Sequence, residues 1–179
     1  MRLRIVYSCY GGAHSSPVAA AIHLGLLPRT VVPRKDAFLR LKLFDQTTAE
    51  HHGDISHIGV DNLGNEVYAL GRGPSGSAME RALMSGVRIA GGSAHNVKVV
   101  DTLPTVNLLM RIGGFLSRGF GWVAIGRPIV LYGIRRAYPR LVHLVEEVER
   151  NLAEGWPVDM GPGAKGVHGP FCGVPEKTK

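Results

Sequence analysis

The stretch that most constrains the fold of this chain runs from Ile5 to Ile22. A short β-branched run ends in Cys9-Tyr-Gly-Gly12, and an alanine-rich apolar segment at helical spacing follows. This pattern predicts a strand, a tight loop and a helix, with the loop at the N-terminus of the helix. Unpaired backbone N–H groups and the positive end of the helix dipole meet there, so the loop is predicted to attract anions. The same field favours the thiolate form of Cys9.

The rest of the chain predicts one α/β domain over residues 1–152. Strands alternate with helices, which favours three layers, with helices on both faces of a mainly parallel sheet of about five strands that includes one antiparallel hairpin. The expected strands cover residues 3–8, 55–60, 66–70, 97–100 and 128–132. The expected helices cover residues 16–24, 36–44, 77–87, 104–116 and 140–152. Residues 153–179 are rich in glycine and proline and are expected to form a flexible tail.

Cysteine usage and the apolar segments favour a cytoplasmic protein. The two cysteines, Cys9 and Cys172, lie far apart and form neither a disulfide framework nor a zinc spacing. The N-terminal apolar run is too short for a signal peptide. Arginines interrupt the apolar residues 108–134, so we expect no membrane span and no membrane partner.

The charge balance is basic, with a net charge of +7 and a pI of about 9.8. A basic chain favours acidic partners such as nucleotides, nucleic acid or anionic lipid. The basic residues are spread out and form no run of the kind that marks a nucleic-acid-binding tail. An RNA-binding or partner-binding module therefore stays an alternative that rests on charge alone, and the sequence does not indicate an oligomeric state.

The loop after the first strand contains most of the candidate site residues. Gly11 and Gly12 would let backbone amides approach a phosphate, Ser15 and Ser16 could add hydroxyl donors, and Cys9 would stand at the strand end as a nucleophile. The alternative is structural. Cys9 would then be a small buried side chain, one of the serines would cap the helix, and the glycines would serve a tight turn.

Four residues outside this pattern complete the candidate site. His14 could act as acid, base or phosphate donor, or could simply hydrogen-bond the backbone. Asp101 follows a buried strand and is a candidate general base or metal ligand, or a helix cap. Arg72, in a second glycine-rich loop, is a candidate phosphate clamp or a solvated charge. Arg111 could reach a ligand or extend its stem over the core. We expect Cys9 and Asp101 to lie at the carboxyl edge of one sheet, on parallel strands that are neighbours or near neighbours.

The eight histidines do not predict a metal centre. His51, His52 and His57 cluster in a polar stretch, but their spacing is not that of a ligand set, and no Cys or Glu pair completes it. We therefore expect no metal, and the sequence indicates no particular cofactor.

The first loop resembles the phosphocysteine loops of two enzyme groups. Cys9, Gly12, Ser15 and Ser16 match the Cys-x-x-Gly-x-x-Ser/Thr-Ser pattern of sugar-phosphotransferase enzyme IIB components. The loop is also similar to the Cys-x5-Arg-Ser-Pro loop of low-molecular-weight tyrosine phosphatases, with Ser15 in place of the arginine that would clamp the phosphoryl group. These resemblances imply cysteine-dependent phosphoryl transfer, which the missing arginine argues against.

A broader resemblance covers residues 1 to about 150. It rests on the segments Val6–Ser16, Asn65–Gly73, Val100–Pro104, Asn107–Arg118 and Gly126–Val130. Together they resemble an uncharacterised bacterial family known as a domain of unknown function, and the resemblance implies no activity. The function that the sequence favours is binding of a phosphate-bearing or other small anionic ligand at the loop of residues 9–16. Phosphoryl transfer by Cys9 is the alternative.

Overall fold

The computed structural model describes residues 2–156, which contain one open four-stranded sheet. Its order is β2 (Ile55–Val60), β3 (Glu66–Gly71), β1 (Arg4–Cys9) and β4 (Val97–Asp101). β1 runs parallel to both of its neighbours, whereas β2 is antiparallel to β3 and forms the expected hairpin with it. The fold is therefore α/β with a mixed sheet.

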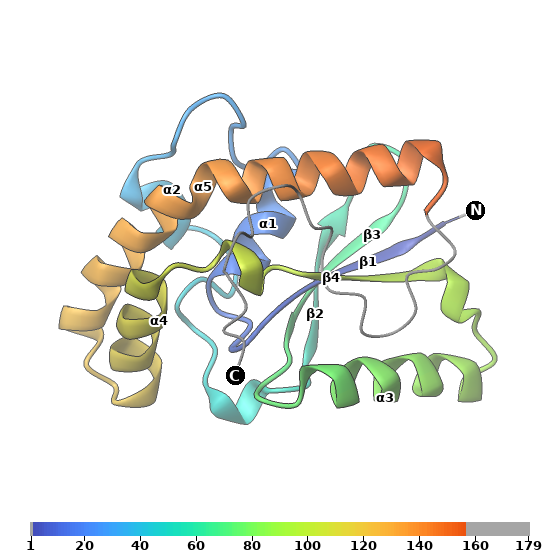
Figure 1. The fold of residues 1–179 in the computed structure, drawn as a ribbon, viewed down its shortest axis with the longest axis horizontal. Helices are drawn as coiled ribbons and strands as arrows, with labels where there is room; N and C mark the ends of the chain where they lie inside the picture. Colours follow the sequence, from blue (N-terminus) through green and yellow to red (C-terminus); the bar gives the residue numbers. More distant parts are fainter. Residues whose placement is uncertain (1, 157–179) are drawn as a thin grey trace, which may run out of the picture.

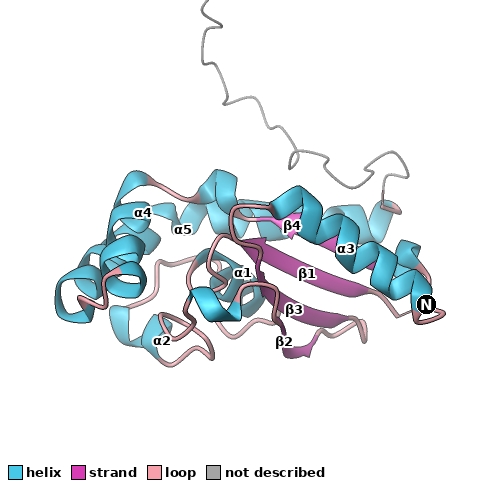
Figure 2. Cartoon of the chain, turned by 90° about the horizontal axis from the view of Figure 1, so that it is seen from below, coloured by secondary structure: helices cyan, strands magenta, loops and turns pink. Residues whose placement is uncertain are grey.

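Helices cover both faces of this sheet (Figures 1 and 2). Alternate residues of β1 point to opposite faces because the side-chain period of a strand is two. Ile5 and Tyr7 belong to the large core with α1 (Ser15–His23) and α5 (Val123–Glu154). Val6 packs on the other face, in a smaller cluster with side chains of α3 (Gly76–Ile89). A short helix, α2 (Lys35–Leu39), adds Phe38 to the large core.

The expected fifth strand is wrong, because residues 128–132 lie inside α5. A short apolar run bounded by a proline fits a buried strand and a buried helix segment equally well. Pro128 and Pro139 both lie within α5. Each proline leaves the carbonyl four residues earlier without a helical partner. Those carbonyls belong to Ala124 and Arg135, which are exposed, so water can satisfy them. The sheet therefore has four strands, and the expected helix at 140–152 is the second half of α5.

The expected helix at 104–116 is divided into three parts. A 3₁₀ turn covers Leu103–Thr105, α4 covers Leu108–Gly114, and a π-helical turn covers Phe115–Gly119. Asn107 caps α4 by accepting a hydrogen bond from the Met110 N–H at 2.9 Å. Two further 3₁₀ turns lie at Ala49–His51 and Ala94–Asn96. Together α4, the π-helical turn and the first half of α5 form a helical hairpin.

The last described residues still contact the folded body. α5 continues two residues beyond position 152, and Trp156 packs against the large core, with the Lys98 ammonium 5.4 Å from its ring centre. The predicted tail from residue 157 onward lies outside the described residues. Within residues 2–156, no helix is both long enough and apolar enough to cross a membrane.

Candidate functional site

The carboxyl edge of the sheet gathers most of the candidate site residues. Ser8 of β1 pairs in parallel register with Asp101 of β4, and Cys9 pairs with Gly71 of β3. This register confirms that Cys9 and Asp101 end neighbouring parallel strands at one edge. In α/β sheets this edge is where ligands bind, because the loops and helix N-termini that follow the strands meet there.

The Cys9 thiol lies within the loop of residues 9–16 and is 4% exposed. Its Sγ accepts a hydrogen bond from the Gly12 N–H at 3.1 Å and lies 3.1 Å from the Ser16 hydroxyl. α1 begins at Ser15, so the sulfur lies beside the start of this helix. The loop thus places a thiol, a backbone donor and a hydroxyl together. This grouping fits the sequence-based hypothesis that Cys9 is a nucleophile, but the thiol has little contact with solvent.

The loop glycines bring two backbones together. Gly12 has a φ of +69°, and a Cβ atom there would lie 2.8 Å from the Gly71 nitrogen. A Cβ atom on Gly71 would in turn lie 2.9 Å from the carbonyl of Gly11. The two glycine-rich loops therefore pack against each other, and Arg72 extends the contact by donating its backbone N–H to the Cys9 carbonyl at 2.9 Å. These glycines serve close backbone packing.

The serines have structural partners and neither caps α1. The N-cap position is His14, whose side chain makes no capping bond. Ser15 and Ser16 are the first two helical residues and are buried. The Ser15 hydroxyl lies 2.8 Å from Thr102 Oγ1, which also lies 2.9 Å from the Ser8 carbonyl. Ser15 therefore joins the start of α1 to the residue that follows β4. It occupies the position at which the phosphatase pattern has its arginine.

His14 is held by a buried carboxylate that the sequence analysis missed. Its Nε2 lies 3.2 Å from Asp45 Oδ1, and Asp45 also accepts bonds from Ser117 Oγ at 2.8 Å and Arg127 Nε at 2.7 Å. Arg118 Nε lies 3.1 Å from the same carboxylate. Burial raises the pKa of Asp45, but the hydrogen bonds from His14, Arg127 and Ser117 lower it more, so its pKa lies well below the usual range. Asp45 stands in a polar stretch, and no local sequence signal distinguishes it.

Arg72 and Asp101 form an ion pair at the same edge, with Arg72 Nη2 2.6 Å from Asp101 Oδ2. The other oxygen of Asp101 accepts the Leu103 N–H at 2.9 Å and so caps the following 3₁₀ turn. Arg72 is thus a partly buried paired charge. Arg111 is exposed on α4 and does not line the cavity beside this pair.

The Arg72–Asp101 pair lines a cavity of about 440 Å³ at the start of α3. Ser8 and Tyr10, the two neighbours of Cys9, contribute to its wall. The N-cap of α3, Ser75, makes no side-chain capping bond, and a Cβ atom on Gly76 would lie 2.7 Å from Arg72 Cδ, so the Arg72 side chain lies against the start of this 14-residue helix. Other lining residues include Gly73, Gly76, Ser77 and Glu80. The structure therefore joins Arg72, Asp101 and the flanks of Cys9 in one cavity.

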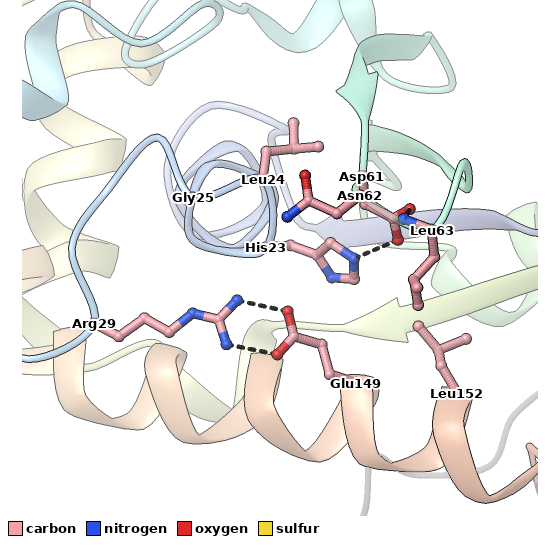
Figure 3. A pocket seen from close by; sticks show the side chains of 9 residues that line it. All are labelled: His23, Leu24, Gly25, Arg29, Asp61, Asn62, Leu63, Glu149 and Leu152. Atoms are coloured by element: carbon pink, nitrogen blue, oxygen red, sulfur yellow. Dashed lines mark hydrogen bonds and ion pairs between the residues drawn. The ribbon is translucent and has the colours of Figure 1, made fainter.

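A second cavity, of about 240 Å³, lies at the amino edge of β1 between α1, the β2–β3 turn and α5 (Figure 3). His23 connects Tyr7 and Asp61 there: its Nδ1 lies 2.8 Å from the Tyr7 hydroxyl and its Nε2 lies 3.2 Å from Asp61 Oδ2. Burial raises the pKa of Tyr7. Arg29 and Glu149, which face each other across the cavity wall, form a bidentate ion pair. The charged side chains of this wall are thus paired, Asp61 with His23 and Arg29 with Glu149.

Within residues 2–156, no three His, Cys, Asp or Glu side chains gather in a way that would hold a metal ion. The histidines that the sequence analysis considered have other neighbours. His51 Nδ1 lies 2.9 Å from the Thr48 hydroxyl, and the rings of His52 and His57 pack edge-on against Tyr10 and Tyr68.

Fold and site together define an α/β protein with a cysteine–glycine loop between its first strand and first helix. The family model described as protein of unknown function (DUF3189) matches residues 4–150, and the chain belongs to this family. The match confirms the broad resemblance seen in the sequence. Neither the curated proteins nor the solved structures give a significant match to the chain.

Proposed function

We propose that this protein binds a small phosphate-bearing ligand at the carboxyl edge of the sheet, beside the loop of residues 9–16. The observation that carries the proposal is the cavity of about 440 Å³ that contains Arg72 and opens at the N-terminus of α3. A guanidinium and the unpaired N–H groups of a helix N-terminus are the donors that proteins use for phosphate.

The acidic side of the cavity narrows the class of ligand. Asp101 and Glu80 line the same cavity, so a bare inorganic anion would meet two carboxylates. A phosphorylated compound with hydroxyl or amino groups fits better, because its phosphate can contact Arg72 while its other groups donate to Asp101. In this arrangement Asp101 orients both the ligand and the Arg72 side chain.

The loop of residues 9–16 packs against the loop that contains Arg72 and so supports the cavity wall. Its glycines hold the Arg72 loop in place through the backbone contact at Gly71, and its own polar groups are engaged within the protein. The ligand would therefore lie next to this loop, against Ser8 and Tyr10, and would be held by the loop that contains Arg72.

Thermal denaturation with adenosine monophosphate, glucose 6-phosphate and inorganic phosphate tests the proposal. Saturation at about 100 times the Kd stabilises the folded state by about 2.7 kcal/mol, which raises the Tm of a protein of this size by about 5–10 °C. We expect a phosphorylated organic probe to give such a shift, and Arg72→Gln to abolish it. Arg88→Gln, an exposed arginine on α3, is the matched control and should keep the shift. If no probe shifts the Tm, or if Arg72→Gln responds like Arg88→Gln, the cavity does not bind phosphate.

The contacts of Cys9 Sγ favour one second candidate, cysteine-dependent phosphoryl transfer. In that reaction the Cys9 thiolate attacks phosphorus, the S–P bond forms as the P–O bond breaks, and the leaving oxygen takes a proton from solvent. Water then attacks phosphorus, loses its proton to solvent and releases the thiolate, which the Gly12 N–H and Ser16 hydroxyl stabilise. Ser15 argues against it, because its hydroxyl is bound to Thr102 and supplies no charge to the transferring group. Alkylation by iodoacetamide at about pH 6, in a Cys172→Ser background, separates the two functions. Phosphoryl transfer requires Cys9 to react faster than a free model thiol and to be protected by phosphate.

A further inference from the structure

The helical hairpin of α4, the π-helical turn and the first half of α5 exposes large apolar side chains. On α4 and its extension these are Leu108, Ile112 and Phe115, which are 68%, 45% and 62% exposed and recur at the spacing of one helix face. Trp122, Ile125, Tyr132 and, at the turn, Phe120 are also more than half exposed. Such a concentration of exposed apolar residues marks an interaction surface.

Glycines occupy the contact between the two arms of the hairpin. A Cβ atom on Gly113 would lie 2.6 Å from the Val130 nitrogen, one on Gly126 would lie 2.4 Å from the Ser117 nitrogen, and one on Gly133 would lie 2.8 Å from the Met110 nitrogen. The two helices thus approach each other backbone to backbone. Because these glycines occupy the contact, the large apolar side chains face outward and cannot be buried between the helices.

Three aromatic rings connect the two arms of the hairpin at its turn. The ring centres of Phe115 and Phe120 are 4.9 Å apart, and those of Phe120 and Trp122 are 5.8 Å apart. We call these three residues the aromatic tip. Each is about 60% exposed, so the cluster covers little of the protein itself. In Figures 1 and 2, α4 and the start of α5 lie at one end of the molecule, away from the sheet.

The charge of the hairpin has one sign. Between Asp101 and Glu146 the chain contains no acidic residue and six arginines: Arg111, Arg118, Arg127, Arg135, Arg136 and Arg140. Two of the six contact the buried Asp45. The other four are exposed on α4 and α5. Within residues 102–145, the exposed apolar side chains are therefore accompanied only by positively charged side chains.

We propose that this hairpin docks on the surface of an anionic phospholipid bilayer, with the aromatic tip entering the headgroup region and the exposed arginines contacting lipid phosphates. Apolar and aromatic side chains beside arginines match an interface that offers both acyl chains and negative charge. A second copy of this hairpin would bring arginines against arginines, and a nucleic acid would leave the aliphatic Leu108, Ile112 and Ile125 without apolar partners. The proposal differs from the sequence-based expectation that no membrane is a partner, and it does not depend on the phosphate cavity.

Co-sedimentation of the full chain with vesicles tests the docking surface. We expect binding to equimolar phosphatidylcholine and phosphatidylglycerol, and little binding to phosphatidylcholine alone. Phe120→Ser/Trp122→Ser should lower the vesicle partition coefficient by about tenfold, because two apolar anchors are lost. Leu26→Ser/Ile89→Ser removes two side chains that are 62% and 88% exposed elsewhere, and should bind like the unchanged protein.

The charge contribution is tested in the same assay. Arg135→Gln/Arg136→Gln should lower partition by about fivefold or more, whereas Arg81→Gln/Arg88→Gln, two exposed arginines of α3, should have less effect. Arg72→Gln should bind vesicles normally, which separates this surface from the phosphate cavity. Absence of binding to anionic vesicles, or equal binding by tip and control variants, would overturn the proposal. Two other results would also overturn it. One is a dimer in sedimentation velocity that Phe120→Ser/Trp122→Ser abolishes. The other is RNA binding, without vesicle binding, that the same variant abolishes.

Discussion

The substitution Asp45→Asn tests whether the buried carboxylate of Asp45 holds the loop of residues 9–16 against the helical hairpin. Asp45 has a φ of +54°, a backbone conformation that asparagine also tolerates, so the substitution removes charge without adding backbone strain. The two arginines beside this side chain, Arg118 and Arg127, can only donate, one to each carboxylate oxygen. Its Oδ2 accepts from Arg127, and its Oδ1 accepts from Ser117 and lies against His14 and Arg118. Whichever oxygen becomes NH₂ then faces a donor.

The expected cost follows from these contacts. Removing one partner of a buried ion pair costs about 3–5 kcal/mol, and losing a hydrogen bond to a charged group costs about 1.5–3 kcal/mol. Arg127 is partly exposed, so water compensates some of its loss. We therefore expect Asp45→Asn to lower the free energy of unfolding by about 2–3 kcal/mol, and the Tm by about 5–10 °C.

The assay is urea denaturation at neutral pH, with Asp36→Asn as the matched control. Asp36 is exposed and lies 3.8 Å from Arg34 and 3.7 Å from Arg40, so its loss should cost less than about 0.5 kcal/mol. If Asp45→Asn lies within about 0.5 kcal/mol of the unchanged protein, the reasoning that its charge is required in the buried site is refuted.

The pH dependence of stability gives an independent check that the pKa of Asp45 is lowered on folding. The pKa of Asp45 is lower in the folded state than the unfolded value of about 3.9, so its contribution is fully present above that value and is lost as the pH falls toward the folded pKa. The stability difference between Asp45→Asn and the unchanged protein should thus narrow as the pH falls below about 4. A difference that widens with acidification would contradict the depressed pKa.

Two further predictions concern backbone packing and the buried histidine. Gly12→Ala should cost about 2–4 kcal/mol in urea denaturation, because its Cβ would meet the second glycine-rich loop at a positive φ, whereas Gly11→Ala, with nothing within 4 Å of the added Cβ, should be nearly neutral. Equal costs for the two glycines would show that the loops do not pack closely. Tyr7→Phe removes the hydroxyl that faces His23 Nδ1 and should cost about 1–3 kcal/mol, while the exposed Tyr132→Phe should change stability by less than about 0.5 kcal/mol in the same measurement. A neutral Tyr7→Phe would mean that His23 needs no partner at that nitrogen.

Local patterns were enough to predict the first strand, its loop and its helix, and also the β2–β3 hairpin. In both cases the determining interactions are close in the sequence: alternation or helical spacing of apolar residues, and glycine or asparagine at turns. The shared edge of Cys9 and Asp101 was also predictable, because parallel strands that are each followed by a helix end on the same side of a sheet.

Residues 128–132 show where local information ends. A run of four apolar or aromatic residues after Pro128 is compatible with either a strand or a helix, and the choice depends on what the run packs against. Here Gly126 and Gly133 let α4 approach closely, and this contact selects the helix. The glycines were visible in the sequence, but the residues that they contact, 9 to 26 positions away, were not.

The sequence by itself therefore determined the α/β class, the cysteine–glycine loop and the basic character of residues 102–145. Only the tertiary structure decided which polar groups meet: Asp45 with His14 and two arginines, Arg72 with Asp101, and His23 with Tyr7 and Asp61. Each of these pairs joins segments separated by 16 to 82 residues. Such contacts form because burial makes an unpaired charge or donor costly, and the identity of the partner depends on which segments the packed core brings together.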